Sequence, residues 1–170
     1  MVLTKPELLG LLQHEVNILQ HLCTKIDPQA LDYRPTPKQR STMELLQYLT
    51  VMGPLLTKAA LAGGQFDRDA WMARSQAAAA LSFADLVKAL AAHTDEYTQL
   101  LASVPDEAFR QPIDMFGTKT TVGAYLVSGV LGGCAAYRTQ LFCYLKACGR
   151  DELGTANLWR GVDPPPPAAK

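Results

Sequence analysis

The sequence lacks an excess of charge of either sign, and it lacks any long hydrophobic run. Its 170 residues include 16 basic and 16 acidic side chains, so the formal net charge is zero. A balanced charge removes the electrostatic signature of proteins that bind nucleic acid or anionic lipid. No apolar run approaches the ~20 residues of a membrane-spanning helix, and residues 1–7 do not have the pattern of a signal peptide. The composition therefore predicts a cytoplasmic protein without nucleic-acid or membrane partners.

The sequence also lacks the common motifs of enzymes and metal sites. No P-loop, GxSxG motif or GxGxxG motif is present, and neither are the Glu-x-x-His pairs of di-iron bundles. The four cysteines contain no CxxC pair, and all of them fall in helical patterns. We expect these cysteines to be small buried hydrophobic residues rather than reactive thiols.

The chain does contain four long helical patterns. They cover about residues 4–26, 42–61, 83–104 and 120–148, with a short extra helix around Trp71 and Met72 in the link between the second and third helices. Capping boxes open the first two helices, at Thr4-Lys5-Pro6-Glu7 and Ser41-Thr42-Met43-Glu44. The long link after the second helix permits a crossover connection. We therefore predict an all-α fold, a four-helix bundle with a crossover, in which residues 1–161 are one domain and residues 162–170 are a Pro-rich flexible tail.

The shorter segments carry weaker signals. Pro112–Lys119, which contains Gly117, predicts a loop or a small pair of extended strands. We expect Trp159 to dock the tail on the bundle. We expect Arg138 to pair with a carboxylate such as Glu44 or to reach loop carbonyls.

The fourth helical pattern contains Gly132-Gly133-Cys134-Ala135-Ala136-Tyr137-Arg138-Thr139-Gln140-Leu141. This stretch resembles the last helix of the DinB-like (damage-inducible) four-helix family, in which the pattern is roughly His-x-x-x-His-Arg-Gly-Gln. Further resemblances lie at residues 31–37, 41–49, 116–121 and 157–161, so the similarity spans roughly residues 8–161. The resemblance implies a bundle with a divalent metal ion held by three histidines between the second and fourth helices. It also implies kinship with thiol-dependent transferases, isomerases or hydrolases.

The three positions of the family's metal ligands are Tyr48, Gly133 and Tyr137 in this chain. Glycine has no ligand atom, and a neutral tyrosine (pKa about 10) is a poor ligand beside imidazole. We therefore expect a DinB-like protein without a metal ion or other cofactor, acting as a non-catalytic binding or interaction protein rather than as an enzyme. The alternative is a divalent-metal-dependent thiol transferase or hydrolase with an altered ligand set, to which Cys134 would contribute.

A candidate ligand pocket follows from the inward-facing residues. His93 shares the inward face of the third helix, whereas the seven-residue spacing of His14 and His21 places both on the polar, solvated face of the first helix. His93 is either a neutral core histidine bonded to a tyrosine hydroxyl, or it lines a pocket for a small apolar ligand. That pocket would comprise Tyr48, His93, Gly133 and Tyr137. The glycines at 129, 132 and 133 indicate close packing, with a neighbouring helix or the Tyr48 ring filling the gap, or a cavity.

Apolar residues cover much of the circumference of the second helix, which indicates burial on more than one side. These residues are Leu45, Leu46, Tyr48, Leu49, Met52, Leu55, Leu56 and Ala59. We expect a homodimer that is formed through exposed apolar helix surface.

Overall fold

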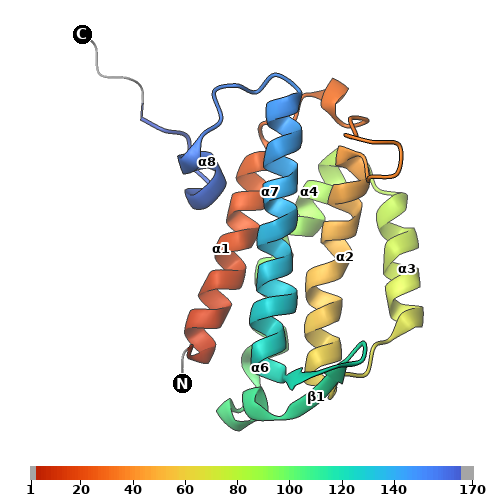
Figure 1. Cartoon of the computed structure of the whole chain (residues 1–170), viewed down its shortest axis with the longest axis vertical. Coiled ribbons are helices and arrows are strands. Elements are labelled where there is room, and N and C mark those ends of the chain that lie inside the picture. The colour runs from red at the N-terminus through yellow and green to blue at the C-terminus, as the bar shows by residue number, and fades with distance from the viewer. Residues whose placement is uncertain (1–2, 166–170) are drawn as a thin grey trace.

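A computed structural model describes residues 3–165, and its helices stand side by side along one long axis (Figure 1). The main elements are α1 (Lys5–Cys23), α2 (Thr42–Leu61), α3 (Arg68–Ala79), α4 (Phe83–Ala91), α5 (His93–Ala102), α6 (Val122–Tyr125), η3 (Leu126–Leu131), α7 (Gly132–Ala147) and α8 (Thr155–Arg160). Short 3-10 turns, η1 (Pro28–Ala30) and η2 (Asp106–Arg110), lie in the connections. α1 and α2 each pack against α4, α5 and α7, and the buried side chains between the elements form two hydrophobic clusters.

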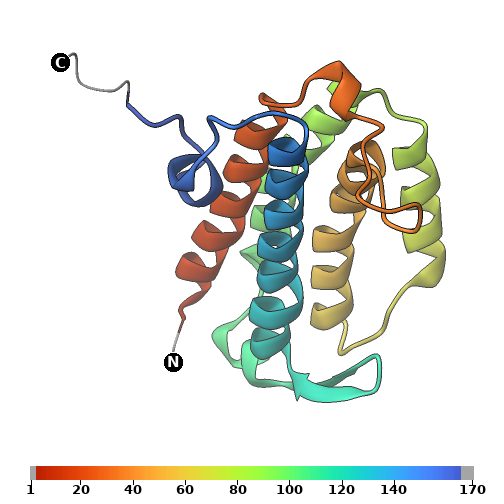
Figure 2. The same cartoon turned by 45° about the horizontal axis from the view of Figure 1, so that its top comes forward.

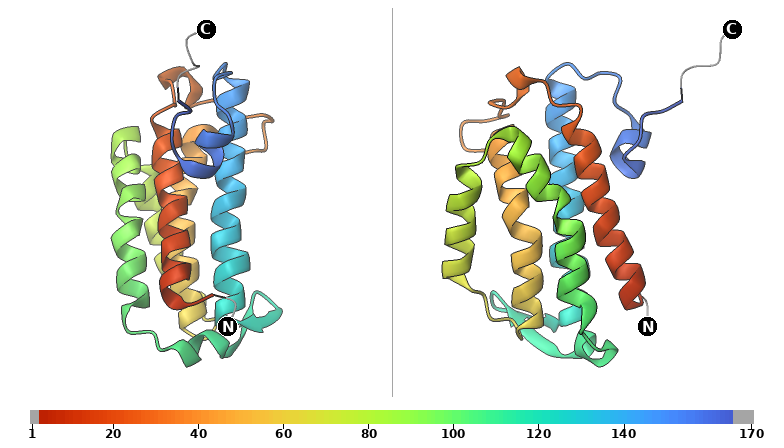
Figure 3. Two further views of the ribbon diagram at one scale, coloured as in Figure 1. Left: turned by 90° about the vertical axis from the view of Figure 1, so that its left-hand side faces the viewer. Right: turned by 180° about the vertical axis from the view of Figure 1, so that it is seen from behind.

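The crossover lies where the sequence predicts it. In the ribbon, α2 and the α4–α5 pair run in the same direction, and α3 runs back between their ends (Figures 1 and 3). The extra helix is longer than the sequence indicated, with twelve residues, because the Asp67 carboxylate caps its first turn by accepting from the Ala70 amide at 2.9 Å. The predicted all-α bundle with a crossover is therefore confirmed.

The helix starts agree with the capping residues, while the later helices are less regular than predicted. Both capping boxes form, at Thr4 with Glu7 and at Ser41 with Glu44. The predicted third helix is divided at Ala92 into α4 and α5. The predicted fourth helix contains the π-helical segment η3 between α6 and α7.

α3 covers the outer side of α2, and the two helices have extensive contact. This contact changes the interpretation of the apolar circumference of α2. Leu45, Leu46, Leu49, Met52 and Ala59 are buried within the single chain. The hydrophobicity around α2 is thus explained by α3 on one side and the bundle core on the other, and it does not require a second copy.

A proline inside α2 ties α3 and α5 to that helix. Pro54 has no backbone N–H, so the Thr50 carbonyl, four residues earlier, has no donor within the helix. Arg74 of α3 supplies one, because its Nε donates to Thr50 O at 2.9 Å. His93 Nε2 of α5 lies 3.1 Å from the same oxygen. The broken helical hydrogen bond thus becomes the attachment point for two neighbouring elements.

The small extended pair predicted at residues 112–119 is a two-stranded antiparallel hairpin. β1 (Pro112–Met115) pairs with β2 (Thr118–Thr121), and the turn between them is Phe116-Gly117. Both turn residues have positive φ, 55° and 84°, which is the conformation that a tight two-residue hairpin requires. The hairpin closes the end of the bundle at which α1 begins (Figures 1 and 2).

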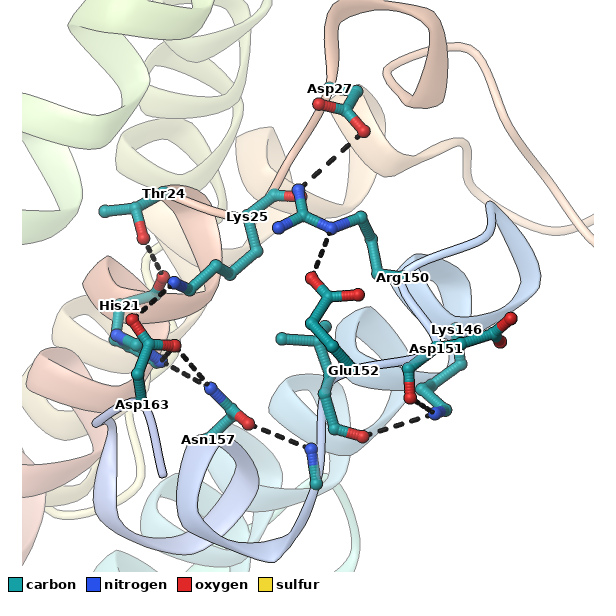
Figure 4. A network of polar contacts seen from close by, with 12 residues as sticks. His21, Thr24, Lys25, Asp27, Lys146, Arg150, Asp151, Glu152, Asn157 and Asp163 are labelled. Carbon is teal, nitrogen blue, oxygen red and sulfur yellow. Dashed lines mark hydrogen bonds and ion pairs between the residues drawn. The ribbon is translucent and has the colours of Figure 1, made fainter. Parts of the chain in front are cut away.

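α8 and the residues around it form a C-terminal strap, residues 150–163, that lies against α1 and α7. Figure 4 shows its polar contacts. Asn157 is buried; its Oδ1 accepts from the Gly154 amide at 2.9 Å, and its Nδ2 lies 3.0 Å from His21 Nε2. Lys25 Nζ of the α1 exit pairs with Asp163 at 2.7 Å. Contacts therefore reach into the predicted tail as far as residue 163; of the rest of that tail, residues 166–170 lie outside the described part of the chain.

Two predictions about surface residues need correction. His21 is not on a solvated face: its side chain is 13% exposed beneath the strap, and burial lowers its pKa. Among the cysteines, Cys23 and Cys134 are buried as expected, but Cys143 is exposed and Cys148 is half-buried. Both errors arise because helical periodicity cannot indicate what packs on a helix from a distant part of the chain. Within residues 3–165, no helix has the length and apolar character needed to cross a membrane.

Candidate functional site

The resemblance implies three metal-ligand positions, and in the structure the side chains at two of them are in contact. Tyr48 of α2 and Tyr137 of α7 meet edge to face, with ring centroids 5.0 Å apart. The Trp71 ring of α3 has its centroid 6.0 Å from that of Tyr48, and the Arg40 guanidinium lies 4.0 Å from the centre of the Tyr48 ring. The predicted pocket position is therefore occupied by an aromatic cluster, here defined as Tyr48, Trp71 and Tyr137 with Arg40.

The phenol of Tyr48 is held in its neutral form. Burial, together with a hydrogen-bonding interaction with Tyr137, raises the pKa of Tyr48 to about 12. A neutral phenol offers a weak oxygen donor, whereas a transition metal such as zinc binds imidazole and thiolate more strongly. The electrostatics of the cluster thus oppose the phenolate that a tyrosine ligand requires.

The space beside the glycines of the fourth helix is filled by side chains from the same chain. A Cβ atom on Gly133 would lie 2.8 Å from Met52 Cε, so the Met52 thioether occupies the place of a side chain at 133. A Cβ atom on Gly129 would lie 2.7 Å from the Tyr125 ring. The sequence offered close packing or a cavity at this point. The structure has close packing: Met52 of the neighbouring helix α2 and Tyr125 fill the space, and not the Tyr48 ring, which was the other alternative.

Cys134, the residue that an altered ligand set would use, lies in a different environment. It is buried and interacts with the Tyr97 hydroxyl, which in turn packs on the bare backbone of Gly53. Burial raises the pKa of the Cys134 thiol to about 12. The sulfur is therefore protonated at neutral pH and turned toward α5, away from the aromatic cluster.

His93 belongs to a separate polar group between α2, α3 and α5. Its Nε2 atom lies 3.1 Å from Thr50 O and 3.3 Å from Arg74 Nη2, and its ring is 6.0 Å from the Tyr97 ring. Arg74 also forms a two-pronged ion pair with Glu96, at 2.7 and 2.8 Å. Burial lowers the pKa of His93 to about 4, so the imidazole is neutral. His93 is therefore a buried core histidine, and its Nε2 atom lies beside a carbonyl and a guanidinium rather than a tyrosine hydroxyl.

Arg138 is the largest fully buried side chain, and sequence reasoning found its type of partner but not the partner itself. Its Nε lies 2.7 Å from a carboxylate oxygen of Glu15 in α1. Its Nη1 donates to the Leu158 carbonyl of α8, and its guanidinium lies 5.0 Å from the centre of the Trp159 ring. The predicted carboxylate, Glu44, instead caps α2 and pairs with Arg34 at 3.2 Å. Burial raises the pKa of Glu15 although the charge of Arg138 acts in the opposite direction.

Trp159 attaches the tail to the bundle through its main-chain carbonyl rather than through a buried side chain. Its carbonyl lies 3.0 Å from His14 Nε2, while its side chain remains 58% exposed. The buried residues of the strap are Leu153 and Asn157, and Gly161 lies close to the backbone of Ile18. The asparagine was a residue of the resemblance, but nothing in the local sequence indicated that it is buried.

The residues present do not fit the metal site that the resemblance implies. Within residues 3–165, no group of three or more His, Cys, Asp or Glu side chains is arranged to hold a metal ion. At the three implied positions stand two tyrosines, of which Tyr48 has a raised pKa, and a glycine whose side-chain space is occupied by Met52. These three residues are suited to packing and hydrogen bonding rather than to binding a metal ion.

Comparisons with known proteins agree with this architecture. A search of curated proteins gives no match. The structure is similar to the crystal structure of a DinB-like protein, YjoA, from Bacillus subtilis, with a TM-score of 0.66 and 19% sequence identity; the match covers 90% of this chain and 96% of that one. At this identity the similarity concerns the fold.

A model of the DinB superfamily matches residues 11–130. The match includes Tyr48 and ends before Gly133 and Tyr137, so the motif of the last helix is a separate observation from it. Because the matched range is more than half of the sequence, the chain belongs to the DinB superfamily.

Proposed function

We propose that this member of the DinB superfamily is a metal-free, non-catalytic protein that acts by binding or interaction. The observation that supports this proposal best is the Met52 side chain in the space beside Gly133. Together with the contact between Tyr48 and Tyr137, it leaves apolar and neutral groups between α2 and α7. To bind an ion here, the side chains between α2 and α7 would have to rearrange, both to bring in donor atoms and to make room for the ion.

Metal content tests the proposal directly. We expect elemental analysis of protein purified without a histidine tag to give no stoichiometric transition metal, before or after incubation with zinc or nickel. One tightly held ion per chain would overturn the proposal. If that ion were lost on changing Cys134→Ala, the altered-ligand alternative, a thiol transferase or hydrolase, would replace it.

A restored site supplies the matched comparison. The variant Tyr48→His/Gly133→His/Tyr137→His would place three imidazoles at the implied positions, and Met52→Ala would make room for the second. We expect the fourfold variant to bind zinc and the single variant Met52→Ala to bind none. Zinc binding by the single variant would mean that the native residues already form a site.

The small apolar ligand expected from the sequence has little room among the four pocket candidates. Tyr48 and Tyr137 contact each other, while His93 has its partners in Thr50, Arg74 and Tyr97. Binding at the aromatic cluster would need the Tyr48 and Tyr137 rings to separate. The cytoplasmic location expected from composition stays a prediction.

The homodimer also remains a proposal, now supported by a different surface. Phe116 at the hairpin tip is 65% exposed and Met72 on α3 is 48% exposed, so large apolar side chains face solvent there. We expect light scattering after gel filtration to give the mass of a dimer. The variant Phe116→Asn, which suits the positive φ of that residue, should give a monomer. A monomeric wild-type protein at all concentrations would contradict this proposal.

A further inference from the structure

A cavity of about 410 Å³ opens at the end of the bundle where α1 begins, distant from the aromatic cluster. Three segments form it: the start of α1, the 3-10 turn η2, and the helical segment α6–η3. Its lining comprises Leu3, Thr4, Lys5, Leu8, Asp106, Phe109, Arg110, Gly123, Ala124 and Val127. The volume is within the range of about 300–1,000 Å³ that is typical of small-molecule sites.

The walls of this cavity are apolar and are held in place by backbone contacts. Gly123 lies so close to the Phe109 carbonyl that a Cβ atom on it would be 2.9 Å from that oxygen, which fixes the distance between η2 and α6. Lys5 donates to the carbonyls of Val104 and Ala102, at 2.9 and 3.3 Å, and so ties α1 to the end of α5. Val127, which belongs to the π-helical segment, is 40% exposed at the cavity. π-helical turns are rare and occur frequently at functional sites.

The rim of the cavity carries polar groups of unequal charge. Lys5 and Arg110 contribute two positive charges, and Asp106 contributes one negative charge. Lys5 has three donor protons and uses two of them on the carbonyls, while Arg110 is exposed beside the apolar walls. An apolar interior with a net positive rim suits an amphiphilic anion, with its chain inside and its head group at the surface.

We propose that this cavity binds a small carboxylic acid with an apolar tail, with the tail between Leu8, Phe109 and Val127 and the carboxylate at Arg110. The site lies outside the aromatic cluster between α2 and α7. The proposal for this cavity therefore does not depend on whether the protein holds a metal ion. It names a class of ligand for a protein whose residues do not fit the metal site that the resemblance implies.

Calorimetric titration of the whole protein with decanoate and with decanol tests this proposal. We expect saturable binding of one decanoate per chain, and weaker binding of decanol because it has no charge for Arg110 to contact. The variant Arg110→Glu should weaken decanoate by about tenfold and remove its advantage over decanol. The variant Ala124→Trp, which fills the cavity from an exposed position of α6, should abolish binding of both.

Two exposed positions supply matched controls. Ala136→Trp on α7 adds the same side chain away from the cavity, and Lys38→Glu reverses an equally exposed charge in the loop before α2. Both controls should bind decanoate as the wild type does, and far-ultraviolet circular dichroism should give the same helix content for all variants. Absence of saturable binding, or binding that Ala124→Trp leaves intact, would overturn the site. Equal affinity for decanoate and decanol would overturn the role of Arg110 and the choice of an acid.

Discussion

At the scale of single residues, a proline has the widest effect. Pro54 removes one helical hydrogen bond, and the freed Thr50 carbonyl is then contacted by Arg74 and His93. Because buried carbonyls are nearly always paired, the side chains that approach Thr50 are part of the structure of α2 itself. The neutral imidazole of His93 is a consequence of this arrangement, since it is buried beside a guanidinium.

His93 should make stability depend on pH in a defined window. Its pKa in the folded protein is about 4, against 6.5 for an unperturbed histidine, so the unfolded chain binds more protons between these values. The free energy of unfolding should therefore fall as pH decreases from about 6.5 to 4, by up to about 3 kcal/mol from this residue. Urea unfolding at several pH values measures this slope.

The variant His93→Gln should flatten the pH dependence relative to wild type, because it removes the buried imidazole. The comparison between variants is needed because Glu15 has a raised pKa and contributes a slope of opposite sign. An equal slope in wild type and His93→Gln would mean that the imidazole is not held neutral by burial.

At the scale of elements, the sequence predicted what is local and missed what is brought from a distance. The starts of α1 and α2 follow from Thr4 and Ser41, because a capping box involves residues only three apart. The carboxylate named for Arg138, Glu44, was wrong, because the actual partner Glu15 comes from a helix that is distant in sequence. The apolar circumference of α2 indicated burial on more than one side, but nothing in that segment reveals that α3 folds back over it and supplies the second side.

The candidate site follows the same division. The absence of histidine at positions 48, 133 and 137 could be read from the sequence, and so could the inward position of His93. The filling of the space by Met52 and Tyr125 could not, because side-chain packing depends on the distance between α2 and the helical segment η3–α7. The cavity at the start of α1 was equally invisible, since three separate segments form its walls.

Arg74 should control the attachment of α3. Its guanidinium joins α3 both to Thr50 of α2 and to Glu96 of α5. We expect Arg74→Ala to lower the free energy of unfolding by about 2–3 kcal/mol, because charge-assisted hydrogen bonds are lost and the Thr50 carbonyl loses its best donor. Arg74→Lys should recover only part of this loss, since an ammonium group cannot make the two-pronged contact.

Hydrogen exchange should localise the effect of Arg74→Ala to the amides of α3. An exposed arginine six residues earlier, Arg68, provides the control, and Arg68→Ala should leave exchange in α3 nearly unchanged. Uniform loss of protection over the whole bundle would contradict the view that Arg74 holds one helix rather than the core.

At the scale of the whole molecule, the buried pair of Glu15 and Arg138 joins the two ends of the chain through α1, α7 and the C-terminal strap. We expect Arg138→Met to lower the free energy of unfolding by about 3–5 kcal/mol, because the Glu15 carboxylate would remain buried without its partner. The loss should be smaller at pH 5 than at pH 8, since protonation of Glu15 then becomes easier in the folded variant than in the unfolded chain.

The double variant Glu15→Leu/Arg138→Met tests the origin of that loss. Replacing both charges with apolar groups removes the uncompensated carboxylate, so the double variant should be clearly more stable than Arg138→Met alone. Urea unfolding of wild type, Glu15→Leu, Arg138→Met and the double variant completes the cycle. A double variant as unstable as Arg138→Met would assign the loss to packing around Arg138 rather than to charge.

The position of the strap at the end of the chain also has a consequence for folding during synthesis. A ribosome delivers α1 first, and the Glu15 carboxylate then has no guanidinium beside it until α7 has been made. The carbonyl of Leu158, the amide of Asn157 and the carboxylate of Asp163 follow later still. The fold therefore closes late in synthesis, and a chain that stops at the end of α7 leaves Arg138, His21 and the adjoining face of α1 without their cover.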